Sequence, residues 1–326
     1  MMRKYAFLLI LTACMMMLAG CASGAENAPE STQKPAHEKP VVPEKLQVNE
    51  QGIPMVKVFE MDEETITEMD LETYLMGVVA GEMKNDWPME ALKAQAILAR
   101  TFVLKFCDEK ESKYPGADIS TDIEEAQAFD NTAINERVEQ AVKETEGMVL
   151  SYQGELPYAW FHAHSGGMTA KAKVGLNYEK EEPGYTKVTA GLDSDQAPEE
   201  AKRWEAAFTE KEFLAAVKEC GVKGVSSIES LEVGKRGVSG RAETIMINGE
   251  EVNAANLRIA LGSTKMRSTL LSTLNFADGK VNMSGKGYGH GVGMPQWGAY
   301  GMAENGKTAE EIVTYYFQDV TVEKLW

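Results

Sequence analysis

LETYLMGVVAGEMKNDWPMEALKAQAILARTFVLKFC, residues 71–107, is the stretch that decides how the rest of the chain is organised. Its apolar residues recur at helical spacing on both sides of a short polar elbow. This pattern predicts one helix over about residues 71–81 and a second over about residues 88–106. Asp70 is the expected N-cap of the first helix. One carboxylate, Glu82, stands at the elbow. The stretch therefore predicts a helical hairpin with an acidic group at its bend.

The second helix is apolar over most of its circumference, which is typical of a helix buried in a core. Asn85 or Asp86 is the expected N-cap. Arg100 lies in its most apolar part, and a buried guanidinium needs a carboxylate or another strong acceptor. The arginine and Glu82 could belong to a binding site. On the pattern alone, a helical hairpin with one structural ion pair is the simpler interpretation.

Composition limits the classes of partner. The chain has 326 residues and a formal net charge of −17, which argues against nucleic acid, because nucleic-acid binding needs clustered Lys and Arg. Of the four cysteines, only Cys107 and Cys220 follow the N-terminal leader. Nothing in the sequence pairs them, so we expect two free thiols.

The N-terminus reads as an export signal. Residues 1–21 combine two basic residues, a short apolar run and the ending Leu-Ala-Gly-Cys, which predicts a cleavable secretory leader. This ending resembles the bacterial lipobox, in which the cysteine becomes the lipidated first residue, here Cys21. Residues 22–51 are rich in Pro, Glu, Lys, Ser and Ala, and we interpret them as a disordered tether.

Residues 52–326 show no internal repeat and no second linker, which favours one large α+β domain of short strands and helices. The patterns predict strands at 55–59, 65–67, 228–233 and 244–247, a hairpin of 148–152 with 158–161, and helices at 131–146, 199–206, 209–219 and 254–261.

Residues 160–169, WFHAHSGGMT, are a first candidate site. In a strand His162 and His164 would share one face, a spacing compatible with a metal. No third ligand is near in sequence, so a metal site is not favoured. Ser165 lacks the G-x-S-x-G elbow of a serine nucleophile. The simplest interpretation is a strand end that leads into a tight turn.

Residues 285–301, GKGYGHGVGMPQWGAYG, are a second candidate. Glycine at every second position from 285 to 293 permits close approach by a ligand or by another strand. Pro295 then opens a helix that carries Gln296 and Trp297. Aromatic faces stack on sugar rings and amides bind hydroxyls, so a sugar-binding surface is one interpretation. A tight sheet corner packed by Trp297 is the other.

Taken together, these segments resemble the SpoIID/LytB family, the stage II sporulation protein D type of peptidoglycan enzyme. The resembling segments occur in the family's order, at residues 74–83, 87–96, 99–101, 165–167, 289–294 and 296–299. The resemblance implies a single SpoIID-like domain of mixed short strands and helices around a substrate groove.

The resemblance also implies an activity. The family's better-studied members are lytic transglycosylases, which cut the MurNAc–GlcNAc bond and leave a 1,6-anhydro-MurNAc end. The family's catalytic acid matches Glu82. The predicted substrate-binding residues are Arg100, Ser165, Tyr185, His290, Gln296 and Trp297. No cofactor is implied, because the cysteines with which some members bind zinc are absent here. Lys84 also replaces a proline that the family often has.

A single carboxylate is chemically sufficient for such an enzyme. The sugar's own C6 hydroxyl attacks the anomeric carbon, so no second carboxylate has to activate water. The acid needs a pKa raised towards neutrality, which apolar neighbours such as Val78 and Trp87 would provide. Arg100 would lower that pKa by contact, so we expect it to face the substrate or another acid.

Two other functions stay open. Part of the family is named as amidase enhancers, which would bind the wall and stimulate a separate hydrolase. A metal-dependent amidase built on His162, His164 and His290 is the third possibility. The expected partners are peptidoglycan glycan strands, a cell-wall amidase and, through the lipid anchor alone, the membrane. The expected location is extracytoplasmic, and sporulation, division and general wall turnover all remain open as roles.

Overall fold

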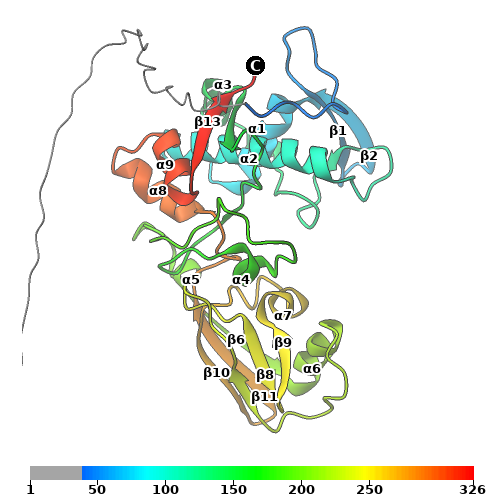
Figure 1. The fold of residues 1–326 in the computed structure, drawn as a ribbon, viewed down its shortest axis with the longest axis vertical. Coiled ribbons are helices and arrows are strands. Elements are labelled where there is room, and N and C mark those ends of the chain that lie inside the picture. Colours follow the sequence, from blue (N-terminus) through cyan, green and yellow to red (C-terminus); the bar gives the residue numbers. More distant parts are fainter. Residues whose placement is uncertain (1–38) are drawn as a thin grey trace, which may run out of the picture. The chain divides into compact units, whose positions relative to one another are not determined.

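Short strands and helices alternate along residues 39–326, the part of the chain that the structure describes (Figure 1). In this computed structural model the strands form several small sheets, with orders β2-β1-β3, β10-β11-β6 and β7-β8-β9 and the pairs β12-β5 and β13-β4. The α+β class predicted from the sequence is confirmed. The leader and Cys21 lie outside the described residues.

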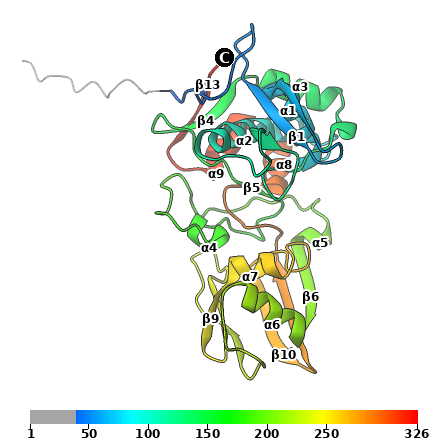
Figure 2. The same ribbon diagram turned by 90° about the vertical axis from the view of Figure 1, so that its right-hand side faces the viewer.

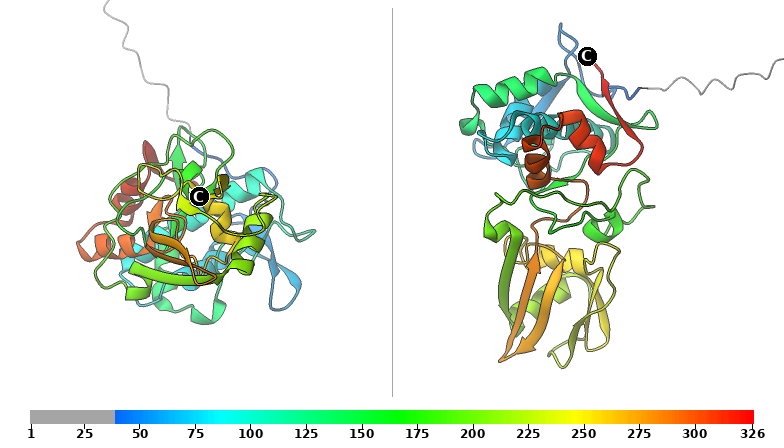
Figure 3. Two further views of the ribbon diagram at one scale, coloured as in Figure 1. Left: turned by 90° about the horizontal axis from the view of Figure 1, so that it is seen from below. Right: turned by 90° about the vertical axis from the view of Figure 1, so that its left-hand side faces the viewer.

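A first hydrophobic core surrounds the two helices of the opening stretch. Helix α2 contacts α1, α3, α8, α9 and β4 and so lies at the centre of this core. In the right-hand view of Figure 3, the late helices, in orange and red, lie beside the cyan helices of the opening stretch. The elements of this core are β1 (Met55–Glu60), β2 (Thr65–Asp70), α1 (Leu71–Glu82), α2 (Met89–Glu109), β3 (Ile119–Ser120), α3 (Glu136–Glu144), β4 (Met148–Tyr152), β5 (Phe161–His162), β12 (Met294–Pro295), α8 (Gln296–Glu304), α9 (Ala309–Tyr316) and β13 (Val320–Lys324). The two ends of the described chain therefore share one core.

Local signals explain most of the helical hairpin. Asp70 caps α1 as predicted, since its Oδ1 accepts a hydrogen bond of 3.0 Å from the Thr73 N–H. Gly81 does not end the helix, which continues to Glu82. A Cβ at Gly81 would instead lie 2.7 Å from the Phe129 nitrogen, so this glycine lets a later loop approach α1. Pro88 takes the N-cap position of α2, so the predicted Asn85 or Asp86 cap is wrong.

A second hydrophobic core lies in the later part of the chain. Its elements are β6 (Arg203–Thr209), α6 (Glu210–Glu219), β7 (Leu231–Val233), β8 (Thr244–Ile247), β9 (Glu250–Asn253), α7 (Ala254–Ala260), β10 (Leu271–Ala277) and β11 (Lys280–Lys286). Figure 2 shows α7 beside the short helix α4 (Ala172–Leu176), which it contacts. The helices predicted over residues 209–219 and 254–261 are present as α6 and α7, and a capping box of Thr209 with Glu212 begins α6.

Two predicted elements are wrong because long-range pairing overrides local pattern. The helix expected over residues 199–206 stops at Lys202 as α5 (Glu199–Lys202), and β6 begins at once, paired antiparallel with β11. Trp204 and Phe208, four residues apart, would share one face of a helix or of a strand. Pairing with β11 over residues 203–209 makes this stretch a strand, which buries both side chains in the second core. The hairpin of 148–152 with 158–161 is also absent. Strand β4 pairs with β13, and β5 pairs with β12.

The tether predicted over residues 22–51 includes residues that belong to the folded part. Residues 40–51 pack on the first core instead of forming a linker. Leu46 is buried, and the Met55 N–H donates to the Gln47 carbonyl at 2.7 Å. The described residues, 39–326, belong to one compact unit. The folded part therefore begins about a dozen residues earlier than the composition suggested.

The alternating glycines bring two chain segments into contact. Gly287, Gly289, Gly291 and Gly293 all have positive φ, between 72° and 107°. Hydrogen bonds join residues 286–294 to residues 160–166, including the His164 N–H to the Tyr288 carbonyl at 3.0 Å. The glycines therefore allow close approach by another stretch of the chain. This was one of the two predicted possibilities, the other being close approach by a ligand.

Gly293→Ala should destabilise the protein. A Cβ at this position would overlap the Trp160 carbonyl oxygen, and φ is +72°. A strained left-handed residue costs about 1–3 kcal/mol, and the overlap adds to that cost. Chemical denaturation of the variant would measure the loss. Gly306→Ala is the matched control, because φ there is +77° and no atom lies within 4 Å of the added Cβ. Equal losses in both variants would contradict the role of close approach.

Two further features complete the fold. Cys107 and Cys220 are free, as expected. Within residues 39–326, none of the helices is both long and apolar enough to span a membrane.

Candidate active site

A cleft of about 360 Å³ opens beside the C-terminal end of α1. Both hydrophobic cores contribute to it, because its lining residues come from α1, α2, β5, α7, α8 and the loops between them. The lining residues are Glu82, Phe102, Ile123, Ala126, Gln127, Trp160, Phe161, His162, Ala163, Arg258, Ser263, Tyr288, Gly289, His290 and Gln296. Glu82 is the one carboxylic acid in this set. The cleft thus combines a single acid with aromatic and amide side chains.

Three elements hold Glu82 in place. It is the last residue of α1, and the elbow turns the chain away after it. The Ala128 N–H donates to its Oε1 at 2.7 Å. The Gln296 amide donates to its Oε2 at 3.1 Å and to its backbone carbonyl at 3.0 Å. Gln296 begins α8 directly after Pro295, so the helix start fixes the amide beside the acid.

The environment of Glu82 makes it a proton donor near neutral pH. Burial raises its pKa to about 7, because desolvation disfavours the charged carboxylate. The hydrogen bonds from Ala128 and Gln296 act in the opposite direction and are the weaker effect. No cation within the described residues forms an ion pair with Glu82. Both protonation states are therefore populated around pH 7, as a general acid and base requires.

Gln296→Met should raise the pKa of Glu82 further. The glutamine amide donates to the carboxylate, so its loss removes a hydrogen bond that favours the charged form. A titration of the Glu82 carboxyl carbon by ¹³C NMR would measure the change. Gln140→Met is a matched control, since that amide bonds the surface residue Glu144 instead. An unchanged or lowered Glu82 pKa in Gln296→Met would contradict the assigned hydrogen bond.

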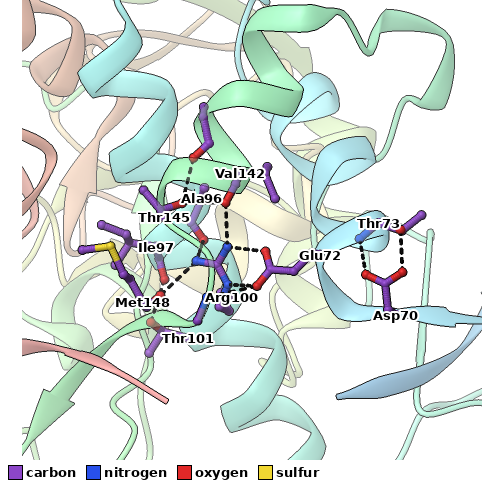
Figure 4. A network of polar contacts seen from close by, with 12 residues as sticks. Asp70, Glu72, Thr73, Ala96, Ile97, Arg100, Thr101, Val142, Thr145 and Met148 are labelled. Atoms are coloured by element: carbon purple, nitrogen blue, oxygen red, sulfur yellow. Dashed lines mark hydrogen bonds and ion pairs between the residues drawn. The ribbon is translucent and has the colours of Figure 1, made fainter. Parts of the chain in front are cut away.

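Arg100 does not contact the cleft, which corrects its predicted role in substrate binding. Its guanidinium is fully buried and forms a bidentate pair with Glu72, at 2.9 Å for Nε–Oε1 and 2.5 Å for Nη2–Oε2 (Figure 4). It also donates to the Met148 carbonyl at 2.9 Å. The alternative expectation, that Arg100 faces another acid, is the one the structure confirms.

Ser165 and Tyr185 also lie outside the cleft lining. Ser165 is fully buried, its hydroxyl donates to Asp193, and it accepts from the Gly167 N–H at 2.9 Å. It therefore shapes the turn before the glycine pair and is not available to a ligand. Tyr185 accepts from the Tyr158 N–H at 3.0 Å and lines a separate pocket. Neither residue is placed to contact a substrate held at Glu82.

Two of the three histidines in the candidate segments line the cleft, and the third does not. His162 and His290 both line the cleft, with ring centroids 5.6 Å apart. His164 is turned away, and its Nδ1 accepts from the Gly166 N–H at 3.0 Å. Burial lowers the pKa of His290 to about 3, with help from the nearby Arg258 and Arg241. Among residues 39–326, no group of three or more His, Cys, Asp or Glu is arranged to hold a metal.

Trp297 belongs to an aromatic cluster next to the cleft. Its ring lies 4.5 Å from that of Trp87 and 5.2 Å from that of Tyr300, measured between centroids. Trp87 is buried, whereas Trp297 and Tyr300 are half-buried. The cluster packs the elbow between α1 and α2 against α8. Trp297 is not among the residues that line the cleft, so only a ligand longer than the cleft would reach it. Contact between Trp297 and a substrate stays a prediction.

Several residues that line the cleft carry no recognisable signal in the sequence. Gln127 is buried, and neither polar atom of its side chain has a hydrogen-bond partner in the described part of the chain. It lies in a polar, turn-rich loop that resembles any surface loop in sequence. Arg258 sits on the short helix α7, where an arginine normally marks a solvated face. Only the folded chain brings these residues to Glu82.

The fold and the cleft define an α+β protein with one protonatable acid in an aromatic cleft, and comparison with known proteins gives its relatives. Residues 60–152 match the Stage II sporulation protein family, SpoIID, and residues 168–293 match a domain of unknown function, DUF8618. An uncharacterised protein of Brachyspira hyodysenteriae is 31% identical over 261 residues, which cover 79% of this chain and 67% of the relative.

Two relatives from Bacillus subtilis carry functional names. Stage II sporulation protein D is 29% identical over 332 residues, covering 94% of this chain and 88% of that protein. The Amidase enhancer is 27% identical over 291 residues, covering 76% of this chain and 40% of that protein. The chain belongs to the SpoIID/LytB family. Membership in this family indicates a role related to the cell wall.

Proposed function

We propose that the chain is a peptidoglycan lytic transglycosylase that cuts the MurNAc–GlcNAc bond and leaves a 1,6-anhydro-MurNAc end. The observation that carries this proposal is the single cleft acid, Glu82, whose pKa burial raises to about 7. A hydrolytic glycosidase of the usual kind needs a second carboxyl group in the cleft. The cleft lining holds no second one.

One acid can carry both proton transfers of this reaction. Glu82 first gives its proton to the glycosidic oxygen as the bond from that oxygen to C1 of MurNAc breaks. The resulting carboxylate then takes the proton of the C6 hydroxyl as the C6 oxygen bonds to C1. The acid is thereby regenerated and no water is consumed. The hydrogen bonds from Ala128 and Gln296 stabilise the intermediate carboxylate.

The remaining cleft residues suit a sugar polymer. Trp160, Phe161 and Phe102 offer apolar faces on which sugar rings can stack. The buried amide of Gln127 and the Nε2 of His162 lack partners within the described residues. Unpaired buried polar groups are costly, so a ligand that supplies hydroxyl and amide groups would satisfy them. A glycan strand carries both kinds of group.

The proposed location is extracytoplasmic, with the leader of residues 1–21 removed and Cys21 lipidated. The leader pattern and the names of the relatives support this location. The proposed domain spans residue 52 to the C-terminus, extended by the residues from 40 onward that pack on its core. A lipid at Cys21 would hold this domain near the membrane face that bears the wall.

Mass spectrometry of glycan fragments tests the activity. The purified protein would be incubated with intact peptidoglycan and with peptidoglycan stripped of its stem peptides. We expect anhydro-ended fragments from at least one substrate. Fragments with reducing ends would instead indicate hydrolysis and would contradict the proposed chemistry.

The second candidate is a wall-binding protein that stimulates a separate amidase. The similarity to the Amidase enhancer favours it, although the chain spans only 40% of that relative. This function predicts binding to peptidoglycan without cut glycan. It also predicts faster stem-peptide release when a cell-wall amidase is added, which the same mass spectra would record.

A further inference from the structure

The cleft wall that comes from the second core carries an arginine with unused hydrogen-bonding capacity. Arg258 on α7 is 8% exposed and lines the cleft. Its Nε donates to the Arg267 carbonyl at 3.0 Å, and its Nη2 is 3.5 Å from the Ser263 carbonyl. Its Nη1 has no partner in residues 39–326. The two contacts that exist orient the guanidinium without neutralising it.

A second buried guanidinium lies behind this wall. Arg241 is fully buried, and its Nη2 donates to the Ser165 carbonyl at 2.6 Å. Its Nε and Nη1 have no partner in the described part of the chain. Ion pairs of the described residues include neither Arg241 nor Arg258, although the whole chain has a net charge of −17. Positive charge is therefore concentrated at one wall of the cleft of an acidic protein.

The groups around Arg258 leave that charge uncompensated. His290 is neutral at pH 7, because burial and the two arginines lower its pKa to about 3. Asp193 is close enough to influence Arg241 but not to form an ion pair with it. Glu82 is held by Ala128 and Gln296. A buried cation without a counter-ion is unfavourable, and a bound anion would supply the counter-ion that the free protein lacks.

We propose that Arg258 binds a carboxylate of the glycan strand and makes the cleft selective for acidic over neutral glycans. The planar guanidinium matches a carboxylate by paired hydrogen bonds, and partial burial strengthens them. Two groups of a peptidoglycan strand could supply the carboxylate: the lactyl group of a peptide-free muramic acid, or a stem peptide. This inference rests on the proposed glycan substrate but not on cutting.

The inference also gives a role to the segment that matches DUF8618. Residues 168–293 include α7 and the loop at Tyr288, whereas Glu82 and Gln296 lie outside that segment. The acid and the carboxylate-binding group would then come from different parts of the chain. One part performs proton transfer and the other recognises the charge of the substrate.

Calorimetric titration tests the proposal with three probes of equal length. They are peptide-free GlcNAc–MurNAc oligosaccharides, the same oligosaccharides with the lactyl carboxyl amidated, and neutral chito-oligosaccharides. The unaltered protein should bind the first about 10- to 100-fold more tightly than the other two, the range expected for hydrogen bonds to a charged group. Arg258→Gln should remove this difference, and Arg258→Lys should retain part of it.

Arg203→Gln is the matched control, because it removes one exposed arginine outside the cleft and should leave all three affinities unchanged. Muropeptides with intact stem peptides distinguish the source of the carboxylate. Tighter binding of these that depends on Arg258 would assign the stem peptide. Equal affinity of the unaltered protein for acidic oligosaccharides, amidated oligosaccharides and muropeptides would overturn the proposal, and this comparison needs no variant. Charge-selective binding without cut glycan would uphold it while the transglycosylase function fails.

Discussion

Glu82→Gln should lower glycan cutting by about 10²- to 10⁴-fold, the contribution typical of a positioned general acid. Glutamine has the same shape and can still accept from the Ala128 N–H, but it has no proton to give to the leaving oxygen. Binding of glycan should be nearly unchanged. Initial rates of anhydro-end formation, with binding measured in parallel, would separate these two effects.

The pH dependence of the same reaction tests the assignment independently. The acid must be protonated at the start, and burial raises the Glu82 pKa to about 7. We therefore expect kcat/KM to fall as pH rises through about 7, approaching tenfold per pH unit above it. Glu155→Gln, which changes an exposed glutamate outside the cleft, should keep this profile. Cutting by Glu82→Gln at the normal rate would show that another group is the acid.

Arg100→Met should destabilise the protein by about 3–5 kcal/mol, the usual result of removing one partner of a buried ion pair. Glu72 would be left 6% exposed and without its cation, holding only the Gly147 N–H at 3.1 Å. For a domain of this size the melting temperature should fall by ~10 °C. Thermal and chemical denaturation would measure both quantities.

The double variant Glu72→Leu with Arg100→Met is the control for this ion pair. It removes both charges, so it should recover much of the lost stability. Glycan cutting per folded molecule should stay close to that of the unaltered protein, because the pair lies away from the cleft. A large loss of cutting in a stable Arg100→Met protein would restore the substrate role that the structure argues against.

The helical hairpin could be predicted because its signals are local. The spacing of Leu71, Tyr74, Leu75 and Val78 and the Asp70 cap act within a few residues. Strand pairing could not be predicted in the same way, since the partner of β4 lies about 170 residues later at the C-terminus. Trp204 and Phe208 likewise suit a strand only because β11 stands beside them.

The acid and its amide partner were predictable for a different reason. Glu82 and Gln296 lie in motifs that resemble a family, and the structure brings them within hydrogen-bonding distance. Arg258 and Gln127 carry no such motif, so only folding reveals them. Arg100 shows the limit of a resemblance, because a motif match alone does not distinguish a residue of a buried ion pair from one that binds substrate.

Both ends of the described chain contribute to the first hydrophobic core, and this affects when that core can form during synthesis. Strand β4 is made long before β13, and the Gly147 carbonyl accepts from the Leu325 N–H only when the last residues are present. Contacts between distant segments form slowly, because the chain loses the entropy of closing a long loop before the contacts stabilise it. The first core therefore cannot be completed until residues 320–325 have been made, and its earlier apolar segments stay unpaired until then. Until then, the sides of β4 and α2 that β13 and α9 cover have no partner.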